Sequence, residues 1–313
     1  MAVRKVSQPE PLLGFLGTSI LRISARLSLR AARAMGTCLG RLGWVLPNQF
    51  KTVSRINIDW CFPELSRRRK RAFLRRVLVA TGQTTTESGP VLSWPVERAR
   101  TLVTDVEGGE LLDRALAKAG PGVVLLLPHL GNWEIVNPFL TARTEVVALY
   151  RRPRIAELEQ IVAAARRRTG CRMVPATPTG LRELFKAVRD GQAAIILPDQ
   201  EPVRTSGVFA PFFGIPALTM TLVQRLVRRF GSQALFVYGY RNPLGFTLRI
   251  REAPEGIDHL DPVVAATALN LGVERCVREC PEQYTWSYKR FKTRPPDESP
   301  RRNYRRPPPH PLP

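Results

Sequence analysis

The sequence lacks any cysteine pattern that would build a disulfide framework or a zinc site. Its 313 residues include only five cysteines, an odd number without a pair of short-spaced pairs. We therefore expect a reducing cytosolic environment, and neither a metal nor another cofactor. Cys276 and Cys280 lie four residues apart and could share one helix face. Without a second cluster, burial in a core is the better prediction for both.

The chain also lacks the G-x-S-x-G turn that presents a serine nucleophile. Histidine is scarce as well. Of the three in the chain, His259 lies in a polar loop and His310 in a proline-rich tail, so only His129 is well placed for chemistry. An imidazole titrates near neutral pH and can take a proton from a hydroxyl. A base without an enzyme nucleophile indicates direct transfer, in which the hydroxyl of the acceptor attacks the donor.

Near the N-terminus no apolar run is long enough to cross a bilayer. The uncharged stretch PLLGFLGTSIL spans only 11 residues, whereas a membrane helix needs roughly 20, and no cleavage site marks a signal peptide. A basic stripe follows, formed by Arg22, Arg26, Arg30 and Arg33. This pattern is typical of an amphipathic helix in a membrane interface; the alternative is an ordinary helix packed on the body with its arginines in water.

Acidic residues are few, because 26 aspartates and glutamates face 48 lysines and arginines, which gives a formal net charge of +22. Such an excess requires an anionic partner: nucleic acid, a membrane surface or a phosphorylated substrate. Aromatic residues make up 8% and do not interleave with the basic runs, and helix-turn-helix, RNA-recognition and zinc-finger signatures are absent. We therefore expect no nucleic acid, and a basic nucleic-acid-binding protein is a remote alternative.

The pattern of apolar residues predicts an α/β fold. Residues 51–100 look helical and basic, and past Val103 short apolar runs alternate with helix-like segments, as in a sheet buried on both faces. The last two runs are split by RNPLG and predict an antiparallel hairpin, so we expect a mixed central sheet flanked by helices. The runs lie at 123–127, 144–150, 193–197, 234–240 and 246–252, and the helix-like segments lie around 109–119, 154–168, 180–190, 217–230 and 261–279.

One further apolar stretch stands apart. Residues 205–224 carry no charge over 20 positions, but Pro211, Gly214 and Pro216 interrupt them. These interruptions predict an apolar loop that lines a cavity or touches lipid rather than a membrane span.

The most informative segment is PHLGNWE at 128–134, directly after the apolar run VVLLL. A strand that ends there places His129 at the carboxyl edge of the sheet, where open α/β folds bind their ligands. A carboxylate that holds the second imidazole nitrogen would improve the base, and Glu134 can supply one if the chain turns into a helix. The alternative is a structural histidine at a strand end, but Gly131 and Asn132 beside it favour a functional site.

Five blocks, in order along the chain, resemble the bacterial lipid A biosynthesis acyltransferases of lauroyl/myristoyl type. HLGNWE at 129–134 looks like the H-x-x-x-x-[D/E] motif of glycerolipid acyltransferases in general. The other blocks are NIDWCFPELS (57–66), LYRRP (149–153), LPDQ (197–200) followed by GVFAPFFGIPALT (207–219), and PEQYTWSYKRFKTRP (281–295). The resemblance implies a glycerolipid-acyltransferase-like α/β domain over 46–293, after a membrane-associated segment over 1–45. The Arg/Pro-rich residues 294–313 are expected to form a disordered tail.

The resemblance implies transfer of a fatty acyl chain from acyl carrier protein, or from acyl-CoA, to a hydroxyl of a lipid A precursor. The enzyme would then work at the cytoplasmic face of the inner membrane, against an anionic membrane surface. The same chemistry on another glycolipid or an aminolipid, for example a phosphatidylinositol mannoside, is the alternative. Acyl chain length does not follow from the motifs.

Carried over to this chain, His129 is the general base and Glu134 is its carboxylate partner or a neighbouring site residue. Related mannolipid acyltransferases pair the histidine with an acid of the second block, which here is Asp199. Asp199 follows one apolar run as His129 follows another, so adjacent strand ends would bring them together; the alternative for Asp199 is a turn residue after Pro198.

The same blocks supply the expected substrate-binding residues. Asn132, or backbone amides near Gly131, would donate hydrogen bonds to the developing oxyanion. Arg151 and Arg152 would clamp acceptor phosphates, while Arg290 and Lys292 would contact phosphate or the acidic carrier, unless they form a solvated basic face. Trp133 and Gln200 complete the set as members of the two central blocks. Three aromatic residues suit either an acyl-chain groove or a plain core: Phe209, Phe212 and Phe213.

Overall fold

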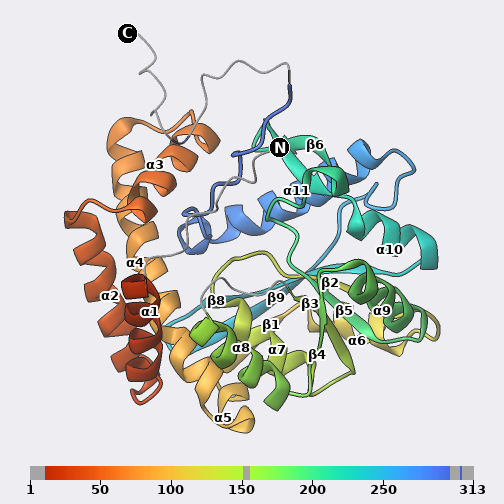
Figure 1. The fold of residues 1–313 in the computed structure, drawn as a ribbon, viewed down its shortest axis with the longest axis horizontal. Helices are drawn as coiled ribbons and strands as arrows, with labels where there is room; N and C mark the ends of the chain where they lie inside the picture. The colour runs from red at the N-terminus through yellow and green to blue at the C-terminus, as the bar shows by residue number, and fades with distance from the viewer. Residues whose placement is uncertain (1–10, 151–155, 297–303, 305–313) are drawn as a thin grey trace.

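The computed structural model describes residues 11–150, 156–296 and 304. A seven-stranded sheet runs through its centre, with helices on both sides (Figure 1). The strand order is β1-β9-β8-β2-β5-β3-β4. The five strands β8, β2, β5, β3 and β4 run parallel to one another, and β9 pairs antiparallel with β8. The predicted mixed sheet and its hairpin are confirmed. The strands are β1 (Val103–Glu107), β2 (Val124–Leu126), β3 (Val146–Tyr150), β4 (Arg172–Pro175), β5 (Ala193–Ile196), β8 (Ala234–Arg241) and β9 (Phe246–Glu252).

Two strands, β1 and β4, were not expected from the sequence. Both lie at the edges of the sheet, and most of their side chains are exposed or only half-buried. An edge strand needs no continuous apolar run, so it leaves a weaker signal than β2 or β5, which are buried along their whole length.

The core lies on both faces of this sheet. Along β2 and its end, Val124 and Leu126 pack in one apolar cluster, whereas Leu125 and Leu127 pack in another. Because successive side chains of a strand point to opposite faces, an unbroken apolar run is what a sheet covered on both sides requires.

The uncharged stretch over 205–224 is a separate hairpin rather than a loop. It forms β6 (Gly207–Phe212) and β7 (Ile215–Met220), joined by Phe213 and Gly214, both of which have positive φ. A two-residue turn of this kind suits the twist of a hairpin. The predicted helix over 217–230 therefore begins too early, since α10 spans Leu222–Phe230. Phe212 and Phe213 belong to the core.

The helices match most of the expected segments. Ser66 caps the basic helix α4 by accepting a hydrogen bond from the Arg69 amide, as its position before the arginine run predicts. The helices are α1 (Pro11–Ser24), α2 (Leu29–Val45), α3 (Gln49–Cys61), α4 (Arg67–Ser93), α5 (Val96–Arg100), α6 (Gly109–Ala117), α7 (Val136–Leu140), α8 (Ala156–Arg168), α9 (Pro178–Arg189), α10 and α11 (Pro262–Glu279), with short 3-10 turns η1 (Trp133–Ile135), η2 (Arg204–Ser206) and η3 (Pro281–Gln283).

The expectation of one continuous N-terminal amphipathic helix is wrong. The chain breaks between α1 and α2, where Ser28 has extended backbone angles and its side chain caps the second helix. Arg33, the last member of the predicted stripe, points inward and bonds Glu87 at 2.5 Å. Among the described residues no helix combines the length and apolar character needed to cross a membrane.

Helices α2 and α4 pack with their backbones nearly touching. A Cβ placed on Gly82 would lie 2.2 Å from the Gly36 carbonyl oxygen, and one on Gly40 would lie 2.5 Å from that of Leu78. At the same interface the Glu87 carboxylate is fully buried and accepts hydrogen bonds from Arg33 and Arg241. Arg241 ends β8, so this ion-pair triad ties the helical layer on the left of Figure 1 to the sheet.

Most of the predicted tail, 297–303 and 305–313, lies outside the described residues. Tyr304 is an exception to the expectation that this tail is unpacked. Its hydroxyl donates to Asn57 Oδ1 at 2.5 Å, and its ring stacks against Trp60 with centroids 5.2 Å apart. Cys276 and Cys280 are buried as predicted, and burial raises the pKa of both thiols.

Candidate active site

His129 and Asp199 meet at the carboxyl edge of the sheet. The strands that they follow, β2 and β5, are parallel neighbours. The Asp199 carboxylate accepts a hydrogen bond from His129 Nδ1 at 2.7 Å with one oxygen, and from the His129 backbone amide at 3.0 Å with the other. Two bonds to the same residue hold the imidazole in one orientation and one tautomer.

The charge balance at this pair favours an ionised carboxylate. Burial raises the pKa of Asp199, but the His129 imidazole and the two hydrogen bonds outweigh burial and leave the pKa below its usual value. Since an ionised carboxylate only accepts, Nδ1 of His129 is the donor in this hydrogen bond. Gln200 Nε2 lies 3.0 Å from His129 Nε2 and donates to it.

Residues 281–285 hold the loop that carries His129 in place through hydrogen bonds to its backbone. The His129 carbonyl accepts from the Thr285 amide and hydroxyl, at 3.0 and 2.9 Å, and the Gly131 amide donates to the Gln283 carbonyl at 3.0 Å. Gly131 has φ of 59°, and a Cβ there would lie 2.1 Å from the Gly239 carbonyl oxygen. Only glycine fits this close, left-handed turn.

The C-terminal block is itself fastened to the core by buried polar side chains. Asn57 donates to the carbonyls of Trp286 and Tyr288, at 2.6 and 2.8 Å, which joins the first sequence block to the last. Arg290 is 2% exposed and donates to Leu218 O and Thr219 Oγ1. The expectation that Arg290 contacts phosphate or the carrier is therefore wrong, because its guanidinium is used inside the protein.

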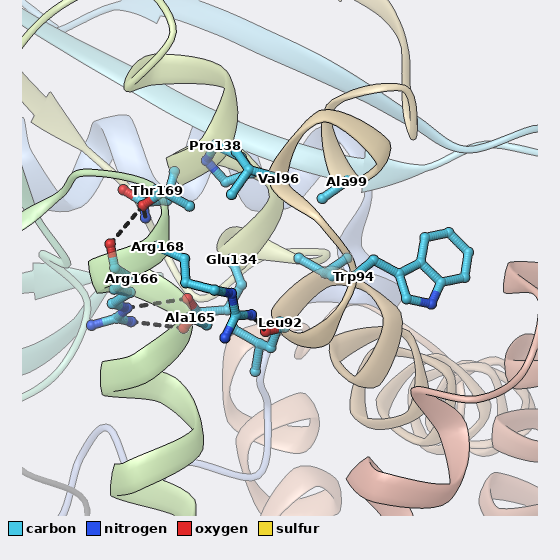
Figure 2. A pocket seen from close by; sticks show the side chains of 12 residues that line it. Leu92, Trp94, Val96, Ala99, Glu134, Pro138, Ala165, Arg166, Arg168 and Thr169 are labelled. Atoms are coloured by element: carbon cyan, nitrogen blue, oxygen red, sulfur yellow. Dashed lines mark hydrogen bonds and ion pairs between the residues drawn. The ribbon is translucent and has the colours of Figure 1, made fainter.

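Glu134 does not contact His129 in this structure. The turn η1 directs its carboxylate to Arg166 of α8, which donates through two nitrogens at 2.7 and 3.2 Å, while the Trp133 indole donates at 3.1 Å. Figure 2 shows the ion pair at the edge of a small crevice between α8 and the end of α4. Burial lowers the pKa of Arg166, but the Glu134 carboxylate outweighs burial and leaves it raised.

A pocket of about 360 Å³ opens in front of His129. His129, Gln200 and the Glu134–Arg166 pair stand on its wall, and the ring of Trp133 lies edge-on to the imidazole with centroids 4.9 Å apart. Most of the remaining lining is apolar: Leu149, Val162, Ala176, Leu181, Ile196, Leu197, Pro202, Val203, Met220 and Leu222. A catalytic imidazole facing an apolar pocket can receive a hydrocarbon chain with one polar reacting end.

The other residues that the sequence predicted for the site differ in whether they reach the pocket. Asn132 is buried, its side-chain atoms have no partner, and it does not line the pocket. The amides of Gly131 and Asn132 already donate to the Gln283 and Gly239 carbonyls, so they are not free for an oxyanion. Lys292 Nζ is half-exposed, 3.6 Å from Glu201 on the pocket wall. Arg151 and Arg152 lie outside the described residues.

Sequence reasoning missed two residues beside the pocket. Arg166 sits in an ordinary arginine run at the end of α8, and only the fold shows which arginine faces Glu134. Arg225 of α10 lines the pocket and forms no ion pair with the residues that the structure describes. The described ranges also contain no group of three or more His, Cys, Asp or Glu arranged to hold a metal ion.

Comparison with known proteins identifies the family of this chain. The profile of the family described as bacterial lipid A biosynthesis acyltransferase matches residues 3–293. This chain belongs to that family. It is 27% identical to the lipid A biosynthesis palmitoleoyltransferase of Escherichia coli (strain K12) over 95% of this chain and 96% of the relative. The lauroyltransferase of the same organism is 27% identical over 92% and 94%, and the myristoyltransferase is 26% identical over 83% and 80%.

Membership of the acyltransferase family makes this chain an acyltransferase, as its sequence blocks predicted. Three of those blocks, around Asn57, Phe213 and Trp286, meet in the core, where Phe62 packs against Phe213 and Trp286 with centroids 5.3 and 5.5 Å apart. Much of this acyltransferase signature therefore records packing around the candidate site rather than contact with substrate.

The Glu134–Arg166 pair supports a first prediction. Glu134→Ala or Arg166→Ala is expected to lower the free energy of unfolding by about 1–3 kcal/mol, because each leaves a largely buried charge without its partner. In a urea-denaturation double-mutant cycle, the double variant should lose less than the sum, with a coupling of about 1 kcal/mol or more. Additive losses would show that the two side chains do not stabilise each other.

Proposed function

We propose that this acyltransferase moves a fatty acyl chain from a thioester, carried by acyl carrier protein or by coenzyme A, to a hydroxyl of a lipid A precursor. The observation that carries the proposal is the His129–Asp199 pair on the wall of an apolar pocket of about 360 Å³, where the Nε2 of His129 accepts a hydrogen bond from Gln200. The family and the printed functions of the Escherichia coli relatives support a lipid A-type acceptor.

His129 acts as general base in the proposed reaction. Its Nε2 takes the proton of the acceptor hydroxyl while that oxygen attacks the thioester carbonyl, which forms the new ester bond as the carbon–sulfur bond breaks. The thiolate then takes the proton from the imidazolium. Asp199 stays ionised and stabilises the imidazolium without receiving its proton.

Gln200 is the best-placed donor for the developing oxyanion. It lines the pocket and donates to His129 Nε2 in the resting structure. Once Nε2 has taken a proton it can no longer accept, so the amide of Gln200 becomes free to donate to the carbonyl oxygen of the substrate. This replaces the amides near Gly131, which are already bonded. An interaction of this kind is worth about 3–4 kcal/mol in the transition state.

The proposed place of reaction is the cytoplasmic face of the inner membrane. Helix α1 packs beside α8, which lines the pocket, and exposes Phe15, Leu16 and Ile23 together with Arg22. Apolar and basic side chains on one short helix suit the interface of an anionic bilayer. Each basic residue near such a surface contributes about 1 kcal/mol.

The direct test supplies the purified protein with a thioester donor and the tetra-acylated lipid A precursor. The expected product is the precursor plus one acyl chain, detected by mass spectrometry. A precursor whose acyl chains lack the 3-hydroxyl group is the control and should not react. Turnover confined to other glycolipids or to an aminolipid would overturn the proposed acceptor and support the alternative one.

A further inference from the structure

A second concave site lies between α2, α4 and η3, outside the active-site pocket. It encloses about 630 Å³ and shares no lining residue with the pocket around His129. We call it the arginine groove, because Arg41, Arg75, Arg76 and Arg241 line it and Glu282 is the one acid among its described lining residues.

Three of these arginines are available to a ligand. Arg41, Arg75 and Arg76 are exposed, and none forms an ion pair with the residues that the structure describes. Arg241 differs, because its guanidinium is already bonded to the buried Glu87 carboxylate. A guanidinium presents a planar fork of donors that matches a phosphate group, so the arginine groove is a preformed site for phosphate oxygens.

The walls of the arginine groove are fixed by the packing beneath them. Helices α2 and α4 meet through glycines, and Gln83 Nε2 of α4 donates to Thr37 Oγ1 of α2 at 2.9 Å on the lining itself. A rigid site binds with a smaller loss of conformational entropy than one that must form around its ligand.

The arginine groove is structurally continuous with the His129 loop. Strand β8 is a parallel neighbour of β2, so Arg241 lies at the same edge of the sheet as His129. Gln283 lines the groove, accepts from the Arg241 amide through its side chain at 2.8 Å, and accepts from the Gly131 amide through its carbonyl at 3.0 Å. The groove and the His129 loop therefore share Gln283 of η3 as a common contact.

The surroundings of the arginine groove favour an amphiphile over an acidic protein. One helical turn beyond Arg41, Val45 is 74% exposed, and Leu42, Leu46 and Phe50 are exposed at the same corner between α2 and α3. Basic side chains in a concave site beside an apolar corner suit a molecule with phosphates at one end and hydrocarbon at the other.

We propose that the arginine groove binds phosphate groups on the head group of the lipid acceptor, while a hydroxylated acyl chain of the same molecule reaches His129. This assignment of the ligand rests on the proposed function above. The groove thus selects phosphorylated acceptors and positions them, and it takes no part in bond making.

The test compares Arg75→Gln/Arg76→Gln with Arg68→Gln/Arg69→Gln. The control pair lies seven residues earlier on α4, on the same face, is exposed and removes the same charge, but it does not line the groove. The probe is the bisphosphorylated tetra-acylated disaccharide lipid in mixed micelles, beside the same lipid without phosphates. Binding is measured by calorimetry and, separately, KM and kcat by turnover.

The groove variant is expected to bind the phosphorylated lipid about tenfold more weakly and to raise its KM by a similar factor, with kcat unchanged. Binding of the phosphate-free lipid should not change, and the control pair should resemble the unaltered protein. Equal losses in both pairs, or a higher KM for the carrier thioester alone, would overturn the proposal. Phosphate-dependent binding without any turnover would keep the groove and reject the proposed function.

Discussion

Replacement of His129 by alanine is expected to lower kcat by about 10²–10⁴-fold, the usual contribution of a general base. The imidazole lines the pocket, its Nε2 accepts only a neutral amide N–H from Gln200, and Asp199 holds it in place. The measurement is steady-state turnover with a thioester donor and the lipid A precursor. A folded variant, checked by its thermal unfolding transition, with near-normal kcat would contradict the base assignment.

Two companion variants sharpen this test. His259→Ala removes an exposed imidazole that does not line the pocket, and it should leave kcat unchanged. Asp199→Asn keeps the shape of the side chain but replaces the anionic acceptor of the His129 Nδ1–H group with a neutral amide. The expected loss in kcat is therefore about 10²–10⁴-fold. If Asp199→Asn had no effect while Glu134→Gln lost activity to the same extent as His129→Ala, Glu134 would be the operative carboxylate.

The largest expected effect on stability is at Glu87. Its carboxylate is 0% exposed and joins Arg33 and Arg241 at 2.5 and 2.6 Å. Glu87→Ala would leave two buried guanidinium groups with no anion, and breaking a buried ion pair in this way costs about 3–5 kcal/mol. Burial lowers the pKa of Arg33 even with Glu87 present, although the carboxylate opposes this shift.

Urea denaturation measures this loss. Glu97→Ala is the control, because Glu97 is 82% exposed in its pair with Arg100 and should change the free energy of unfolding by less than about 1 kcal/mol. Should Glu87→Ala fail to fold, Glu87→Gln retains part of the hydrogen bonding and should show a smaller loss. Equal effects at Glu87 and Glu97 would show that the triad does not stabilise the fold.

Five of the seven strands of the central sheet were predictable because each leaves a local apolar run, which the edge strands β1 and β4 lack. The apolar runs that became β2, β3, β5, β8 and β9 are buried strands, and buried strands read as unbroken apolar sequence. A further error lies in a segment whose local sequence is compatible with two different structures. Residues 205–224 were expected to form an apolar loop that lines a cavity or touches lipid; they pair as the hairpin β6–β7, and Ser206, Met220 and Leu222 at its ends line the pocket.

The sequence by itself determined the α/β class, the family blocks and the position of His129 at a strand end. The partner of His129 was decided by the order of strands, because β5 lies beside β2 although β3 and β4 come between them in the chain. Glu134 is only five residues from His129, yet η1 turns it towards Arg166.

For the net charge, too, the sequence gives the total and the tertiary structure gives the role of each charged residue. Composition established an excess of +22, but it did not separate arginines that hold the interior from arginines that face a partner. Arg290 is buried and Arg33 is largely buried, and both are bonded inside the protein, whereas Arg75 and Arg76 line an open groove. Local sequence sets helix and strand periodicity, but a charged side chain is inside or outside according to which distant carboxylate or carbonyl meets it, and only the tertiary structure brings those groups together.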